Sequence, residues 1–201
     1  MATKAPDPGR DIYQLKVTLL GTKPPIWRRL LVYSDTTLAQ LHDVLQTVMG
    51  WDDSHMHEFR AGQRRFGQPE PADPFMRMPR VESERTARLR TVLGNAGAKM
   101  VYAYDFGDSW EHNIVLEKLL PAGPNTPCPI CIDGRLACPP EDCGGIPGYY
   151  GLLEAINNPD DASYEEMRDW IDENFDPNAF SIDEVNRRLS PRPRRSRTRP
   201  R

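Results

Sequence analysis

Two histidines lie within the segment Trp51-Asp-Asp-Ser-His-Met-His-Glu-Phe59. The pattern predicts a strand over residues 55–61, which places His55 and His57 on one face because side chains two apart in a strand point the same way. Imidazole nitrogens at that spacing can share a metal ion, and zinc commonly takes such ligands. Histidines that pack on the surface or across strands are the ordinary alternative, and both interpretations stay open.

A second polar segment, Tyr104-Asp-Phe-Gly-Asp-Ser-Trp-Glu-His112, falls where two strands are joined by a turn. Asp105 and Asp108 lie at or beside the turn, and His112 follows on the same strand face as Trp110. Carboxylates near an imidazole suit a hard-metal site or general acid–base chemistry. The alternative is ordinary turn chemistry, in which Asp and Gly form the bend and His112 is a hydrogen-bonded core residue.

The four cysteines have the spacing C-x2-C-x6-C-x4-C inside the proline- and glycine-rich segment 121–148. Zinc is held by four thiolates in a tetrahedron, and Cys128-Pro-Ile-Cys131 resembles half of a zinc knuckle. The other half, Cys138-Pro-Pro-Glu-Asp-Cys143, is wider and stiffened by two prolines. Zinc as a cofactor, four reduced thiols and a regulated disulfide are the three interpretations. The candidate metal ligands are Cys128, Cys131, Cys138 and Cys143.

Hydrophobic periodicity indicates the elements that must position these residues. Strands are expected at 12–20, 26–33, 55–61, 64–66, 99–105 and 110–120, mostly as antiparallel hairpins. Helices are expected at 37–49, 149–157, 163–174 and 181–189, with a helical turn at 88–93. No βαβ alternation appears, so the class is α+β. We expect a mainly antiparallel sheet built from hairpins, one helix after the first hairpin, C-terminal helices packed on the sheet, and a long Pro/Cys-rich loop.

The charge is unevenly distributed over the 201 residues. Residues 1–190 carry 20 basic and 29 acidic side chains, and an acidic body of this kind binds nucleic acid poorly. Residues 191–201 are the exception, and they are either a nucleic-acid-binding arm, a solubilising end or an arm that folds back on the acidic body. Their arginines are Arg192, Arg194, Arg195, Arg197, Arg199 and Arg201.

The same composition favours one domain over residues 11–190, between a disordered N-terminus (1–10) and a basic disordered tail (191–201). No apolar run reaches the length of a membrane span, and the first ten residues lack a signal-peptide core. These observations predict a cytoplasmic protein with no membrane partner. Glycine-rich nucleotide loops, the serine-hydrolase elbow and the zincin motif are absent from the sequence.

Five segments occur in the order Pro25-Ile-Trp-Arg-Arg29, Trp51-Asp-Asp-Ser-His-Met-His-Glu-Phe59, Tyr104-Asp-Phe-Gly-Asp-Ser-Trp-Glu-His112, Cys138-Pro-Pro-Glu-Asp-Cys-Gly-Gly145 and Phe175-Asp-Pro177. Over residues 11–189 the chain resembles the plasmid pRiA4b open-reading-frame-three-like family, whose members often carry a transposon passenger label of the TnpR type. The resemblance implies a compact α+β domain and an association with mobile elements. It also implies that Cys131 and Cys138 are the usual pair and that Cys128 is a departure.

Three functions follow from these observations. The first is a binding or accessory module that holds an unknown protein or small ligand in a pocket lined by His57, Asp105, Asp108 and His112. The second is a metal-assisted, hydrolase-like enzyme that uses the same residues. The third is a nucleic-acid accessory protein that acts through the arginine tail. The full set of pocket candidates is His55, His57, Asp105, Asp108, Trp110, Glu111, His112, Glu141 and Asp142.

Overall fold

A single eight-stranded sheet organises the molecule. The computed structural model describes residues 11–69, 80–123, 126–158 and 175–190. The strand order is β5-β4-β3-β6-β7-β1-β2-β8, with antiparallel neighbours except for the parallel pair β4 and β5. The strands are β1 (Asp11–Leu19), β2 (Trp27–Tyr33), β3 (His57–Ala61), β4 (Arg64–Gly67), β5 (Val81–Ser83), β6 (Lys99–Tyr104), β7 (Trp110–Pro121) and β8 (Ile130–Arg135).

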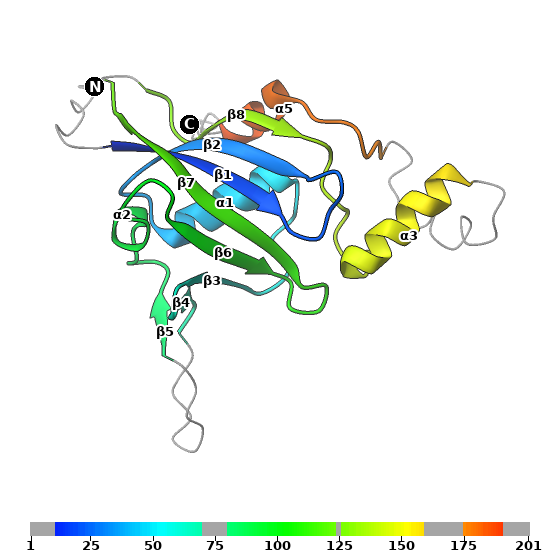
Figure 1. The fold of residues 1–201 in the computed structure, drawn as a ribbon, viewed down its shortest axis with the longest axis horizontal. Coiled ribbons are helices and arrows are strands. Elements are labelled where there is room, and N and C mark those ends of the chain that lie inside the picture. The colour runs from blue at the N-terminus through cyan, green and yellow to red at the C-terminus, as the bar shows by residue number, and fades with distance from the viewer. Residues whose placement is uncertain (1–10, 70–79, 124–125, 159–174, 191–201) are drawn as a thin grey trace, which may run out of the picture.

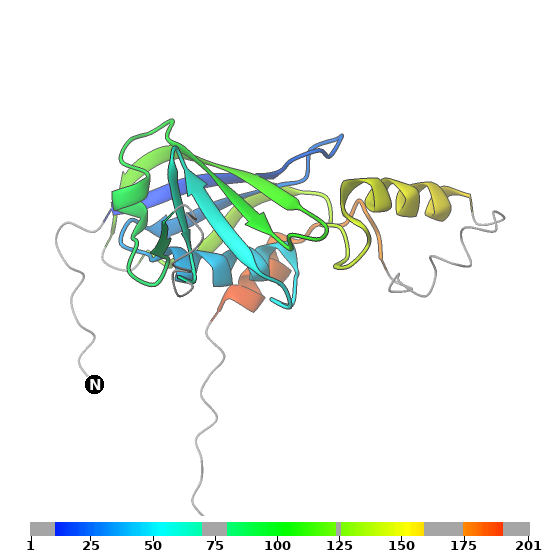
Figure 2. The same ribbon diagram turned by 90° about the horizontal axis from the view of Figure 1, so that it is seen from below.

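The sheet is almost entirely antiparallel and two of the helices follow its last strand, so the fold is α+β, as the sequence predicts. The helices are α1 (Leu38–Met49), α2 (Leu89–Val92), α3 (Gly145–Asn157) and α5 (Ile182–Leu189). Helix α1 crosses one face of the sheet, and α3 extends beyond one end of it (Figures 1 and 2). Among the described residues, no helix combines the length and apolar character needed to cross a bilayer.

Helix α1 begins and ends where its sequence indicates. The Thr37 side chain accepts a hydrogen bond from the backbone N–H of Gln40, and the Gln40 side chain accepts one from the N–H of Thr37. This capping box satisfies two donors that the first helical turn leaves without partners. Gly50 ends the helix with a φ of 86°, a left-handed conformation that glycine adopts at little cost. The apolar stripe of α1 packs against the sheet, where its leucines are fully buried.

A buried cation, Arg28, joins β2 to the end of α1. Its side chain is on the core face of β2 and only 3% exposed. Its Nε donates to the carbonyl of Val48 (2.9 Å), and its Nη1 donates to the carbonyl of Arg135 (3.0 Å). The guanidinium also lies over the Phe180 ring at 4.3 Å. A positive charge at a helix C-terminus stabilises the last carbonyls, so Arg28 fixes where the next segment, residues 51–56, leaves the helix.

The segment 121–148 is not the continuous loop that its composition predicts. Strand β8 lies inside it and pairs with β2, and α3 begins at Gly145 instead of residue 149. Only Cys131 of β8 is buried, so the strand lacks the alternation that reveals longer strands. The Asn186 side chain of α5 donates to the carbonyl of Cys131 and accepts from its N–H, each at 2.8 Å. These two bonds satisfy backbone groups of β8 that face away from the sheet, because β8 is an edge strand.

Two further differences from the sequence prediction concern strands. Strand β3 begins at His57, so His55 precedes it, and the stretch 68–85 contains the short strand β5. Pro147 lies in the first turn of α3, where its missing N–H costs nothing. The predicted helix 163–174, the N-terminus 1–10 and the tail 191–201 lie outside the described residues.

Candidate functional site

Three distant segments meet at one end of the sheet. They are the loop 50–56 after α1, the end of β6 with the following turn (105–109), and the segment 139–143 before α3. The Trp51 indole donates to the carbonyl of Pro139 (3.0 Å) and stacks on Tyr104 with ring centroids 5.1 Å apart. The Tyr104 hydroxyl accepts a hydrogen bond from the N–H of Ser54 (3.0 Å) and donates to the Glu141 carboxylate. Aromatic packing and a shared hydroxyl therefore hold the three segments together.

Burial and the adjacent Glu141 carboxylate raise the pKa of Tyr104 to about 12. The hydroxyl is therefore protonated at neutral pH and acts as the donor to Glu141. The second carboxylate oxygen of Glu141 accepts from the backbone N–H of Asp52 (3.1 Å). Glu141 is consequently held by two donors from two different segments.

The convergence creates a cluster of one imidazole and two carboxylates, called here the His55 centre and defined as His55, Asp105 and Asp142. His55 Nε2 lies 3.0 Å from Asp142 Oδ1 and 3.7 Å from Asp105 Oδ2. The three ligand atoms lie within 4.8 Å of one another. His55 Nε2 is buried and makes no hydrogen bond of acceptable geometry, although both carboxylates are close.

These separations resemble the distances between ligands of one metal ion. Nitrogen and oxygen ligands about 2.0–2.2 Å from zinc lie roughly 3.0–3.5 Å from each other. One of the two separations at His55 Nε2 falls at the short end of that range, and the other exceeds it by a few tenths of an ångström. The donor set of one imidazole and two carboxylates suits zinc or manganese better than a thiophilic ion.

The backbone presents both carboxylates in an uncommon conformation. Asp105 has a φ of 53° and Asp142 a φ of 57°, in the left-handed region that most residues avoid. Asp105 Oδ1 accepts from the N–H groups of Gly107 (2.9 Å) and Asp108 (3.3 Å), which leaves Oδ2 directed to His55. One carboxylate therefore shapes the turn with one oxygen and faces the imidazole with the other.

Asp108 anchors the turn 105–109 to α3. Its Oδ2 accepts from the N–H of Gly144 (3.1 Å), and its carbonyl oxygen would lie 2.5 Å from a Cβ added to Gly145. Only glycine permits that approach. Asp108 thus positions the centre without belonging to it.

A second histidine cluster lies deeper, between α1 and β3. His42 and His57, called here the buried histidine pair, stack with centroids 3.5 Å apart and planes 8° apart. His57 Nε2 lies 2.7 Å from a Glu84 carboxylate oxygen, and His42 Nε2 lies 2.8 Å from Asp53. Nitrogen lone pairs lie in the ring plane, so two parallel rings cannot both direct a lone pair at one ion. The pair is a packed polar core element in this arrangement.

The hydrogen bonds of this cluster determine the tautomer of His42. The N–H of Asp53 donates to Gln46 Oε1 (3.1 Å), so the Gln46 amide nitrogen is the group that donates to the Tyr102 hydroxyl (2.9 Å). That hydroxyl then donates to His42 Nδ1 (2.8 Å), and His42 Nε2–H donates to Asp53. Burial and the neighbouring His57 lower the pKa of His42, in agreement with a neutral ring.

Trp110 and His112 lie in the core of β7 and are fully buried. The His112 ring lies between Trp51 (5.2 Å) and Tyr102 (5.4 Å), and burial lowers its pKa to about 4. Trp110 Nε1 and His112 Nε2 make no hydrogen bond with the described residues. Glu111 is on the opposite strand face, paired with Arg60.

The structure therefore brings together some of the predicted pocket residues and separates others. His55, Asp105 and Asp142 meet, with Glu141 and Asp108 as their supports. His55 and His57 fall in different ligand clusters, because β3 starts two residues later than predicted and leaves His55 in the preceding loop. His57 and His112 each contact the Tyr102 ring, with centroids 5.9 and 5.4 Å from it, and do not fall in one ligand cluster.

The thiols are dispersed. Cys138 Sγ lies 3.1 Å from Met49 Sδ, whereas Cys131 Sγ faces the carbonyl of Asp133. In the described part of the chain, no three thiols bring their sulfur atoms within 4.8 Å of one another. Burial raises the pKa of the Cys131 and Cys138 thiols. Burial also raises the pKa of Cys143, to about 12. Protonated, separated thiols are not arranged as a tetrahedral zinc site.

The sequence did not reveal the buried histidine pair. His42 falls on the apolar stripe of α1, four residues after Leu38, and that position was a usable signal. Glu84 lies in a stretch, 68–85, for which the sequence predicts no helix or strand, and it carries no such signal.

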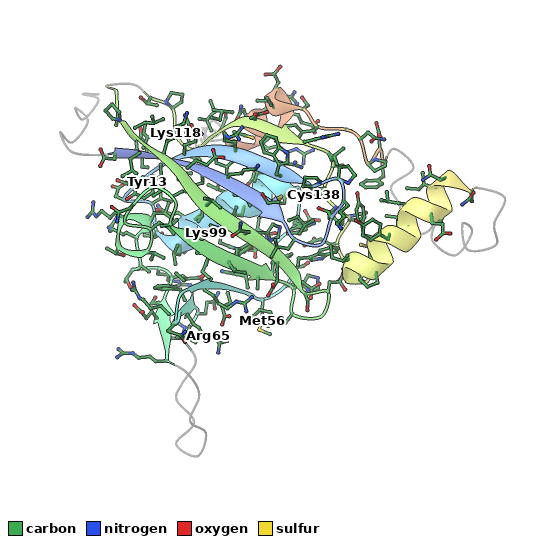
Figure 3. The ribbon with its side chains drawn as sticks, in the orientation of Figure 1. Tyr13, Met56, Arg65, Lys99, Lys118 and Cys138 are labelled. Carbon is green, nitrogen blue, oxygen red and sulfur yellow. The ribbon has the colours of Figure 1, made fainter. Side chains whose placement is uncertain are left out.

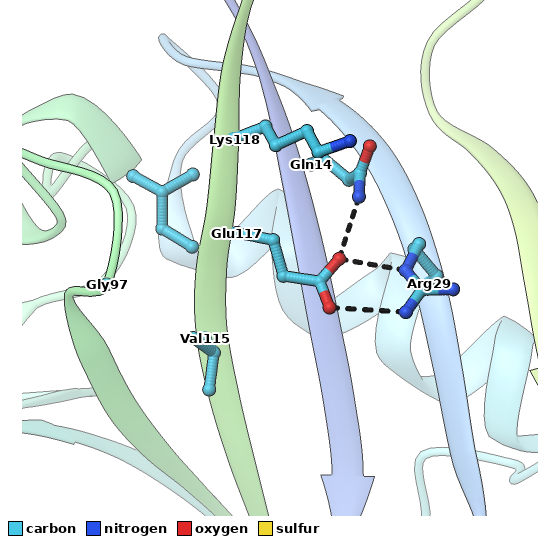
Figure 4. Close-up of a pocket in the computed structure, with 7 residues that line it drawn as sticks. Gln14, Arg29, Gly97, Val115, Glu117 and Lys118 are labelled. Carbon is cyan, nitrogen blue, oxygen red and sulfur yellow. Dashed lines mark hydrogen bonds and ion pairs between the residues drawn. The ribbon is translucent and has the colours of Figure 1, made fainter.

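A surface hollow of about 520 Å³ lies elsewhere, on the sheet face over β1, β2 and β7 (Figure 4). Three of its polar side chains pair with one another: Arg29 binds Glu117 with two hydrogen bonds (2.8 and 3.2 Å), and Gln14 donates to the same carboxylate (2.7 Å). These bonds tie β7, β1 and β2 together. Because these three side chains satisfy one another whereas His55 Nε2 makes no hydrogen bond of acceptable geometry, the His55 centre is the stronger candidate.

Comparison with known proteins agrees with this fold. The family model described as "Plasmid pRiA4b ORF-3-like protein" matches residues 11–184. The chain belongs to the plasmid pRiA4b ORF-3-like family. A curated relative, "Uncharacterized protein y4hQ" of Sinorhizobium fredii (strain NBRC 101917 / NGR234), is 35% identical over 178 residues, which cover 88% of this chain and 90% of y4hQ.

A solved structure is also similar to this pRiA4b ORF-3-like chain. The protein of unknown function MM3350 from Methanosarcina mazei Go1 is 35% identical, with a TM-score of 0.78. The match covers 88% of this chain and 97% of MM3350. The α+β architecture is thus shared with MM3350.

Proposed function

We propose that this family member is a binding module built around a divalent metal ion held by His55, Asp105 and Asp142. The observation that carries the proposal is His55 Nε2, which lies 3.0 and 3.7 Å from two carboxylate oxygens and makes no hydrogen bond of acceptable geometry with either. Three sequence segments far apart in the chain supply the three ligands. Zinc and manganese are the ions that this donor set fits best.

Three protein ligands leave at least one coordination position for a partner. Structural zinc sites close their shell with four protein ligands, whereas sites that bind or convert a ligand keep a position open. The module would therefore hold a small ligand or a partner side chain through the ion. The association with mobile elements rests on the family label alone and adds no chemistry to this proposal.

Metal stoichiometry tests the proposal. The full chain, purified without chelator, is dialysed against zinc and measured by elemental analysis, and we expect one ion per chain. Asp105→Asn is the sharpest variant, since its Oδ1 still accepts from Gly107 and Asp108 while a ligand oxygen becomes an amide. We expect it to lose the ion, as His55→Ala does.

Two controls sharpen the result. Asp133→Asn removes an exposed carboxylate of β8 that pairs with Arg29, and this variant should keep the ion. Cys131→Ser should also keep it. Zinc that is lost on Cys131→Ser and retained on His55→Ala would refute the proposal in favour of a thiolate site.

Metal-assisted hydrolysis is the second candidate function, favoured by the position of Glu141. This carboxylate is held by Tyr104 and Asp52 and directly precedes the ligand Asp142, so it is placed to take a proton from an ion-bound water. Glu141→Gln should keep the ion and lose hydrolysis of a chromogenic ester or phosphodiester. Equal hydrolysis by wild type and Glu141→Gln would exclude this role.

A further inference from the structure

Two large apolar side chains close in sequence to the residues of the His55 centre are exposed to solvent. Met56 is 66% exposed and Phe106 is 52% exposed. Each directly follows a proposed ligand in sequence, His55 and Asp105 respectively. The N–H of Asp105 donates to the carbonyl of Met56 (2.9 Å), so the two segments lie side by side, and Met56 lies beside the turn 105–109 (Figure 3).

Phe106 is held in a rigid turn. Asp105 Oδ1 accepts from the two N–H groups that follow Phe106, and the N–H of Ser109 donates to the carbonyl of Asp105 (2.6 Å). The Ser109 hydroxyl donates to the carbonyl of Phe106 (3.4 Å). An exposed aromatic ring on a fixed backbone is preorganised for contact with a ligand, which lowers the entropy cost of binding.

The charges around the centre select against polyanions. Asp52, Asp108 and Glu141 surround it, and among the described residues none of them forms an ion pair with lysine or arginine. One divalent ion offsets only the two ligand carboxylates. Nucleotides and other phosphate-rich molecules would meet uncompensated negative charge, so a neutral or singly charged ligand is favoured.

We infer that the ligand of this centre is a small molecule with one metal-binding anionic head and an aryl or alkyl group that packs on Met56 and Phe106. The inference rests on the proposed function, because the head group binds through the ion. The apolar group supplies the selectivity, since burying it together with the two exposed side chains removes apolar surface from water.

Two hydroxamates that share a metal-binding head test the inference. Acetohydroxamate carries a methyl group and benzohydroxamate a phenyl group. We expect the zinc-loaded full chain to bind benzohydroxamate about tenfold more tightly by isothermal titration calorimetry, a ratio that contact with one aromatic ring can supply. Phe106→Ala and Met56→Ala should each reduce the ratio to about threefold or less. Leu119→Ala, which removes a side chain 42% exposed near the far end of β7, should leave it unchanged.

The outcomes separate the two claims. Zinc binding with equal affinity for both hydroxamates overturns this inference and leaves the metal site standing. A preference for benzohydroxamate that survives Phe106→Ala and Met56→Ala also overturns it. A chain that binds no zinc overturns the proposed function and this inference together.

Discussion

His112 shows how one enclosed side chain makes the whole fold sensitive to acid. The ring is fully buried between aromatic side chains, and its pKa falls from 6.5 to about 4. Between pH 4 and pH 6.5, His112 is therefore protonated in the unfolded chain and neutral in the folded chain. The free energy of unfolding is unaffected by this group above pH 6.5. As the pH falls from 6.5 to 4, protonation of His112 in the unfolded chain lowers the free energy of unfolding by about 3 kcal/mol.

Chemical denaturation at pH 7.5 and pH 4 measures this effect. We expect the free energy of unfolding of His112→Leu to fall less between the two pH values than that of the wild type, by about 3 kcal/mol. The other titrating groups are common to both proteins and cancel in the comparison. Identical losses in wild type and variant would show that His112 is not the group responsible.

The two core tyrosines of β6 are predicted to differ in what they support. Tyr102→Phe leaves His42 Nδ1 and the Gln46 amide without a partner in the core, at a cost of about 1–3 kcal/mol of stability with metal binding retained. Tyr104→Phe releases Glu141 and the N–H of Ser54 beside the His55 centre, so zinc affinity should fall. Thermal unfolding and zinc calorimetry of both variants distinguish the roles. Loss of zinc binding in Tyr102→Phe alone would reverse the assignment.

At the scale of elements, the close contact between α3 and the turn 105–109 is the joint on which the site depends. Gly145 has a φ of 66°, and an added Cβ would lie 2.5 Å from the Asp108 carbonyl oxygen. Gly145→Ala should cost on the order of 2–3 kcal/mol of stability and weaken zinc binding, because α3 must move and Asp142 lies just before it.

Gly62→Ala is the matched control for this prediction. Its φ is 58°, close to that of Gly145, and an added Cβ meets no atom within 4 Å. This variant reports only the backbone penalty of alanine in the left-handed region, about 1 kcal/mol, with zinc binding unchanged. Chemical denaturation and zinc calorimetry of both variants separate backbone strain from the steric clash with Asp108. Equal losses of stability and of zinc affinity in the two variants would exclude the proposed role of the contact between α3 and the turn 105–109.

The elements with strong periodicity were predictable, and the weak ones were not. The alternation of β1 and β7 and the apolar spacing of α1 each repeat one physical preference over a whole element, and the capping box at Thr37 and Gln40 marks where α1 begins. Strand β8 buries only Cys131, and α3 starts with glycine and proline. Both are stabilised by contacts across the fold, such as that of Asn186 with β8, which no local pattern records.

The site was predictable at the level of segments and not of side chains. The segments 51–59, 104–112 and 138–145 were each identified as polar signatures, and all three converge. The choice of histidine depended on whether the strand begins at residue 55 or 57. Because β3 begins at His57, His55 stays in the preceding loop and meets Asp105 and Asp142, whereas His57 packs against His42 and His112 is buried in β7.

For the whole molecule, a metal ion would add a cross-link between segments that hydrogen bonds and aromatic packing already join. An ion that binds the folded chain alone stabilises it by about 2.7 kcal/mol at a concentration one hundred times the dissociation constant. We therefore expect zinc to raise the melting temperature of the wild type and to leave that of Asp105→Asn unchanged. Equal shifts in both proteins would mean that zinc acts elsewhere.

The most direct test is to locate the ion. Crystals of the full chain grown with zinc and without chelator would be measured at the zinc absorption edge. The anomalous map should contain one peak about 2.0–2.2 Å from His55 Nε2, Asp105 Oδ2 and Asp142 Oδ1. A peak among the cysteine sulfur atoms, or no peak between these three side chains at saturating zinc, would contradict the account.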